Sequence, residues 1–188
     1  MAFACLLATP VIAEETAFPA LTYTPWTKFC LSNTCFVGRD GHSIPDCRPV
    51  VAVALIERSG DTKKTLRVTL PTRVSREHGV RIIIDQNQAI ERPFGSCFAN
   101  GCNADYDAGA ELVDQLKQGR MLVLEAIDKA NSPISLTVPL IDFASAYNGP
   151  AEEPKVFEEV VSSVEEIRAR LERATRAEEE RKARCEAR

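Results

Sequence analysis

Short segments in which apolar and polar residues alternate fill the middle of the chain. Such alternation predicts β-strands, because successive side chains of a strand point to opposite faces of the sheet. Turn residues separate most of these segments, which is typical of antiparallel meanders with one buried face. The predicted strands are TCFVG (34–38), VVAVALIER (50–58), TLRVTL (65–70), VRIIID (80–85), RMLVLEAID (120–128) and ISLTVPLID (134–142).

One segment of this region has helical spacing instead. In DAGAELVDQLKQG (107–119), Leu112, Val113 and Leu116 fall on one side of a helix. Gly119 stands where the C-cap of that helix is expected. The region then ends in FASAYNGP (143–150), which we interpret as turn residues. These elements predict a mainly β fold: an antiparallel β-sandwich or barrel-like domain with one internal helix.

The composition changes at Pro150. Residues 155–188 contain no glycine and no proline, and apolar residues from Val160 to Ala174 recur at spacings of four and three. This spacing is the a/d pattern of a coiled coil, but it lasts for only about two heptads. We therefore predict a linker and a long, charged, amphipathic C-terminal α-helix over 150–188. Its apolar stripe is expected to pack on its own domain or to fray in water. The alternative is a weak coiled coil or a partner helix, with weak self-association through this helix.

The N-terminal residues resemble a signal peptide. MAFACLLATPVIA (1–13) is apolar, is too short to span a bilayer, and ends in a small-x-small pattern, although no Lys or Arg precedes the apolar run. A buried N-terminal strand or helix is the alternative interpretation. With export, 1–13 is a clipped signal peptide, 14–25 an extended leader and 26–149 the β-rich domain. The mature protein is then periplasmic, secreted or on the cell surface.

The overall charge argues against one class of partner. The net charge is −4 and the isoelectric point is about 5.4, whereas nucleic-acid binders usually carry a basic face. The two histidines, His42 and His78, limit histidine-based metal sites and nucleophile chemistry. We predict no nucleic-acid partner and no membrane-spanning segment.

Acid–base chemistry has few candidate residues. Asp105, Asp107 and Glu111 lie close together in the sequence, and paired carboxylates can transfer protons or bind calcium. We interpret them as acidic residues at the N-terminus of the predicted helix, where the helix dipole favours them. No motif surrounds Ser135 or Ser145. The sequence therefore predicts no catalytic residue, no cofactor and no metal ligand.

The seven cysteines allow several interpretations. Asn100-Gly101, between Cys97 and Cys102, predicts a tight turn in which a disulfide joins the two cysteines. A zinc module that uses the Cys30/Cys35 and Cys97/Cys102 pairs is the alternative, whereas a redox motif needs a narrower spacing. Cys30 and Cys35 can bond to each other, but either one can instead bond to Cys47. The sequence alone leaves this choice open. The remaining two are Cys5 and Cys185.

Several of these segments together resemble the invasion-associated locus B family of alphaproteobacteria, over about residues 24–160. They are PWTKFC…CFVGRD, PVVAVALIE, LRVTLP, GVRIIIDQ, CFANGCNADYDAGAELVDQLKQG and PISLTVPLIDFASAYNGP. The resemblance implies an exported, mostly antiparallel β-protein without recognised catalytic residues, linked by name to host-cell invasion. It also implies two disulfides, because Cys30 and Cys35 match the family's first cysteine pair and Cys97 and Cys102 its second. Cys47 and Cys185 have no counterpart.

The resulting prediction is a non-enzymatic, exported β-rich protein of the bacterial envelope or surface. It has a binding or host-interaction role, and its partner is an unknown protein or envelope component. A zinc-binding module and an envelope enzyme with an unrecognised site are the alternatives.

Overall fold

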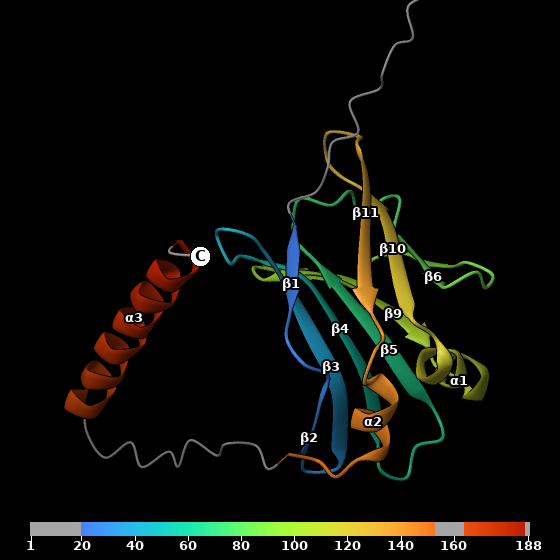
Figure 1. The fold of residues 1–188 in the computed structure, drawn as a ribbon, viewed down its shortest axis with the longest axis horizontal. Coiled ribbons are helices and arrows are strands. Elements are labelled where there is room, and N and C mark those ends of the chain that lie inside the picture. Colours follow the sequence, from blue (N-terminus) through green and yellow to red (C-terminus); the bar gives the residue numbers. More distant parts are fainter. Residues whose placement is uncertain (1–19, 153–163, 187–188) are drawn as a thin grey trace, which may run out of the picture.

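The computed structural model describes residues 20–152 and 164–186 (Figure 1). For α3, side-chain burial is described for residues 171–184. The elements in chain order are β1 (Leu21–Tyr23), β2 (Thr27–Leu31), β3 (Thr34–Ser43), β4 (Pro49–Arg58), β5 (Lys64–Leu70), β6 (Val80–Ile84), β7 (Ile90–Arg92), β8 (Ser96–Phe98), β9 (Gly101–Asp107), α1 (Ala110–Gln118), β10 (Met121–Ile127), β11 (Pro133–Pro139), α2 (Phe143–Asn148) and α3 (Val164–Glu186).

The described strands form two antiparallel sheets. The seven-stranded sheet has the order β1-β3-β4-β5-β9-β8, and β2 pairs with β3 on the same side as β1. The four-stranded sheet has the order β11-β10-β6-β7. The inner faces of both sheets contribute to one buried cluster, whose largest fully buried side chains include Tyr106, Phe143, Leu55, Leu66 and Leu124. The predicted antiparallel β-sandwich is confirmed.

The alternating segments bury the expected side chains. Leu66, Val68 and Leu70 of β5 are all at most 1% exposed, and the residues between them face outward. The predicted internal helix corresponds to α1, which buries Leu112, Val113 and Leu116.

The structure also contains elements that the sequence pattern did not predict. The short strands β1, β2, β7 and β8 lie at sheet edges, and β1 belongs to the segment that we expected to be an extended leader. At the other end of the domain, α2 is a short helix where we expected turn residues. These elements have three to six residues each, which is too short for a periodic pattern to identify.

Three side chains close the sandwich along the free edge of β11. The Tyr23 hydroxyl donates to the carbonyl oxygen of Thr137 at 2.6 Å. Trp26 Nε1 and Arg39 Nη1 donate to the carbonyl oxygen of Pro139 at 3.0 and 2.6 Å. An edge strand presents backbone groups that lack a strand partner, and here residues of the other sheet satisfy two of them.

The C-terminal helix is present as α3. Leu171, a member of the predicted apolar stripe, is 63% exposed, so of the two expected fates of the stripe this residue does not pack on its own domain. Val160 and the rest of 153–163 lie outside the described residues, as do the predicted signal peptide (1–13) and Cys5.

Candidate functional site

The hairpin of β2 and β3 carries a disulfide on the inner face of its sheet. Cys30 and Cys35 are directly opposite each other in the strand register, and their sulfur atoms are 2.04 Å apart. Ser32 and Asn33 form the two-residue turn between the strands, and Ser32 has a φ of 53°. The disulfide fixes the end of this hairpin, because it joins the second residue pair from the turn, next to the pair of Leu31 and Thr34.

The outer face of the same hairpin carries an exposed apolar patch. Because side chains alternate along a strand, the neighbours of the two cysteines point to the opposite face. Phe29 and Phe36 stack there with ring centroids 5.0 Å apart and 14° between their planes. Leu31 is 53% exposed and Phe29 is 36% exposed. Ile56 of β4 lies opposite Phe36 in the register. We call Phe29, Leu31, Phe36 and Ile56 the hairpin patch.

A shallow hollow of about 470 Å³ continues the hairpin patch across the outer face of the sheet. Its apolar lining includes Phe36 and Ile56. Arg67 and Asp105 on its far side form an ion pair with 2.7 Å between Nη2 and Oδ2. The hydrogen bond from Arg67 to Asp105 raises the pKa of the Arg67 guanidinium. The other charged residues that line the hollow are Arg58, Asp61, Lys63 and Asp107. The surface thus combines an apolar centre with a charged border of both signs.

The hairpin of β8 and β9 repeats this construction at the opposite edge of the seven-stranded sheet. Cys97 and Cys102 face each other in the register, with their sulfur atoms 2.03 Å apart. Phe98, next to Cys97, is 60% exposed. The turn differs from our expectation, because Gly101 pairs with Phe98 and is therefore a strand residue. Gly101 has a φ of 151°, and the two-residue turn is Ala99-Asn100.

This arrangement rules out the predicted zinc alternative. The two cysteine pairs are consumed in disulfides, and they lie at opposite edges of one sheet. Within residues 20–152 and 164–186, no group of three or more His, Cys, Asp or Glu side chains is arranged to hold a metal ion. Pairing of Cys30 with Cys35 also excludes Cys47 as the partner of either one. Cys47 is itself disulfide-bonded.

The acidic residues beside α1 have other positions than we predicted. Asp105 lies within β9 and pairs with Arg67. Asp107 is the last residue of β9, and Gly109 is the N-cap of α1, without a side-chain cap bond. Only Glu111 lies in the first helical turn. The interpretation of all three as N-terminal helix residues is therefore wrong for Asp105 and Asp107.

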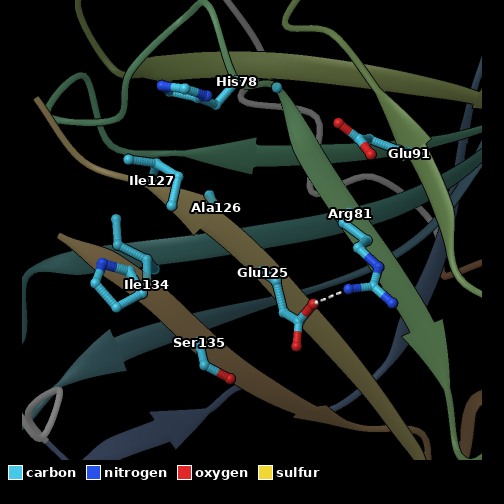
Figure 2. Close-up of a pocket in the computed structure, with 10 residues that line it drawn as sticks. His78, Arg81, Glu91, Glu125, Ala126, Ile127, Ile134 and Ser135 are labelled. Carbon is cyan, nitrogen blue, oxygen red and sulfur yellow. Dashed lines mark hydrogen bonds and ion pairs between the residues drawn. The ribbon is translucent and has the colours of Figure 1, made fainter. Parts of the chain in front are cut away.

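A second hollow, of about 380 Å³, lies on the outer face of the four-stranded sheet (Figure 2). Arg81 Nη1 and Glu125 Oε2 are 3.1 Å apart, and Ser135 lies opposite Glu125 in the register. The His78 ring points away from Arg81 and Glu91 (Figure 2). A nucleophile and its base must be within hydrogen-bond reach of each other, and Ser135 and His78 are not arranged in this way.

The other residues considered in the sequence lie apart from both hollows. His42 is a residue of β3 and Ser145 a residue of α2. No described helix is both long and apolar enough to cross a lipid bilayer.

Comparison with known proteins identifies the family. The family model described as "Invasion associated locus B (IalB) protein" matches residues 26–151. A solved structure, that of the invasion associated protein b from Bartonella henselae, is similar in fold with a TM-score of 0.57. The match has 24% sequence identity and covers 68% of this chain and 94% of that chain. No curated protein matches. The family model covers most of the sandwich, from Trp26 to the end of the domain, and the chain belongs to the invasion associated locus B family.

Proposed function

We propose that the protein is exported and acts by binding a polypeptide partner at the bacterial envelope or the host surface, without catalysis. Two observations support export. Disulfides persist in oxidising compartments, and the structure has disulfides in the hairpins of β2–β3 and β8–β9. The apolar segment 1–13 has the length and the ending of a signal peptide.

The hairpin patch is the observation that supports binding. Aromatic side chains at the centre of an interface contribute most of the binding energy in many protein complexes. Phe29 and Phe36 are held in place by their mutual stacking and by the disulfide on the opposite face of the hairpin. Rigid anchors lose little conformational entropy when a partner binds. The border of mixed charges around the patch is typical of the polar rim of a protein interface.

A quantitative capture experiment tests this proposal. The tagged protein is used to isolate partners from an envelope extract of the producing bacterium, and the dissociation constant of each captured protein is then measured. Phe29→Ala is expected to weaken binding about tenfold or more, as truncation of a central aromatic anchor does. Phe98→Ala is the matched control, because Phe98 is also exposed beside a disulfide but lies at the opposite edge of the sheet.

The comparison of the two variants distinguishes specific binding at the hairpin patch from non-specific hydrophobic binding. Equal losses for Phe29→Ala and Phe98→Ala, or no loss for Phe29→Ala, contradict the proposed surface. Circular dichroism of both variants shows whether the fold is retained.

Export has a separate test. N-terminal sequencing of the native protein is expected to begin near Glu14. A cytosolic protein that keeps Met1 contradicts export and leaves the binding surface to be judged by the capture experiment.

A further inference from the structure

The turn between β3 and β4 holds half of a third disulfide. Cys47 is disulfide-bonded, whereas the other four cysteines within 20–152 are bonded inside their own hairpins. Two cysteines of the sequence remain as partners within the chain, Cys5 and Cys185. The structure does not describe the side chain of either cysteine. The surroundings of Cys47 must therefore show which of the two is its partner.

The turn presents Cys47 in a fixed position. The Cys47 backbone N–H donates to the carbonyl oxygen of Ser43, and the Ser43 N–H donates to the carbonyl oxygen of Arg48, both at 2.9 Å. The buried Ser43 hydroxyl donates to the Asp46 carboxylate. Arg48 pairs with the same carboxylate at 2.9 Å. A turn that is ordered in this way adds little entropic cost when its cysteine forms a bond.

The last turns of α3 reach this turn. Arg181 Nη1 donates to the carbonyl oxygen of Cys47 at 3.3 Å. Figure 1 shows the C-terminal end of α3 beside the connection between β3 and β4. Position 185 is four residues beyond Arg181, and residues four apart lie on the same face of a helix, one turn from each other. The observed contact therefore favours Cys185 over Cys5.

We propose that Cys47 and Cys185 form a disulfide that fastens the end of α3 to the turn between β3 and β4. The two thiols transfer two protons and two electrons to another disulfide, either that of oxidised glutathione or that of a thiol oxidoreductase. The accepting disulfide is thereby reduced to two thiols. Residues 171–184 of α3 are all exposed, so these residues supply little of the buried apolar surface that normally docks a helix. In the proposal, the disulfide holds this end of the helix in place of such packing.

Peptide mapping tests the pairing directly. The full-length chain is reduced, refolded in a glutathione redox buffer and digested with trypsin in the absence of reductant. Trypsin does not cleave Arg48-Pro49, so Cys47 is in peptide 40–58, Cys185 is in 185–188 and Cys5 is in 1–28. Mass spectrometry is expected to find 40–58 linked to 185–188, and reduction to separate them. A link from 40–58 to 1–28, to glutathione or to a second copy of 40–58 overturns the proposal.

Counting free thiols gives an independent readout. With Cys47 bonded to Cys185, the refolded full-length protein, unfolded again without reductant, has one free thiol. Cys185→Ser is then expected to have two and Cys5→Ser none. A bond between Cys47 and Cys5 reverses these two results and overturns the proposal. Each hairpin disulfide lies within one tryptic peptide, 29–39 or 82–117. In the same digests, each of these peptides should gain the mass of two hydrogen atoms on reduction, which shows that each variant has folded.

Discussion

Arg39 Nη1 lies 2.6 Å from the carbonyl oxygen of Pro139, and this hydrogen bond joins the two sheets of the sandwich. The Nε and Nη2 atoms of the same guanidinium donate to the carbonyl oxygen of Thr24 at 2.9 and 2.7 Å. Burial lowers the pKa of Arg39, in opposition to the nearby charges of Tyr23 and Asp142. The hydrogen bonds to two backbone carbonyls compensate for the loss of hydration.

Replacement of Arg39 is expected to destabilise the sandwich. Arg39→Met keeps most of the aliphatic stem but removes the donors to Thr24 and Pro139, so the free energy of unfolding should fall by about 1.5–3 kcal/mol. Urea denaturation measures this change. Arg67→Met is the control, because the Arg67–Asp105 pair is well exposed and such pairs contribute about 0–1 kcal/mol. Equal losses in the two variants contradict the role of Arg39.

The carboxylate of Glu57 makes stability depend on pH. Burial raises its pKa, but hydrogen bonds from Lys64 and Tyr147 and the charge of Lys64 outweigh burial, so that the pKa is below its ordinary 4.5. A folded-state pKa below the unfolded one means that the unfolded chain binds more protons. The stabilisation is therefore present above the unfolded pKa and is lost as the pH falls through the folded pKa.

The variant Glu57→Gln tests this dependence. The stability difference between wild type and variant should be largest near neutral pH. It should shrink as the pH falls below 4.5, the ordinary pKa of a glutamate side chain. Urea denaturation at a series of pH values gives the difference. Glu125→Gln serves as the control, because its ion pair with Arg81 is about half exposed and contributes about 0–1 kcal/mol. If the difference in unfolding free energy between wild type and Glu57→Gln grows at acid pH, the proposed role of the Glu57 carboxylate is contradicted.

Gly101 is required by the close contact of β9 with β5. Its φ is 151°, and an added Cβ lies 2.6 Å from the carbonyl oxygen of Leu70. Gly101→Ala should therefore lower stability by more than about 1 kcal/mol. Gly109→Ala is the matched control, because an added Cβ at Gly109 has no atom within 4 Å. Thermal unfolding of the two variants compares them, and a Gly109→Ala loss as large as that of Gly101→Ala contradicts this account.

Each hairpin disulfide is expected to stabilise the domain to a modest degree. Both close very short loops, with a sequence separation of five, for which the chain-entropy model gives about 2 kcal/mol. The double variant Cys97→Ala/Cys102→Ala should cost more than Cys30→Ala/Cys35→Ala, because Cys102 is buried in the core and its removal also leaves a cavity. Urea denaturation of both double variants gives the order, and the reverse order contradicts this packing argument.

The sequence by itself determined the features that depend on local periodicity. The alternation of Leu66, Val68 and Leu70 specifies the buried face of β5, because side chains of a strand alternate between faces whatever the strand pairs with. The spacing of Leu112 and Leu116 specifies the buried side of α1 in the same way. The two Cys-x4-Cys segments fit cross-strand disulfides because a two-residue turn places the flanking residues opposite each other.

Only the tertiary structure decided the features that depend on distant residues. Asp105 pairs with Arg67, and its strand, β9, is a neighbour of β5 only through the sheet order. Phe29 reads as an ordinary apolar residue in the sequence, and its exposure follows from its place on the outer face of an edge strand. The apolar stripe that contains Leu171 left packing and exposure both open in the sequence, and in the structure Leu171 is exposed. Periodicity fixes which side chains share a face, but the pairing of strands decides which face is covered.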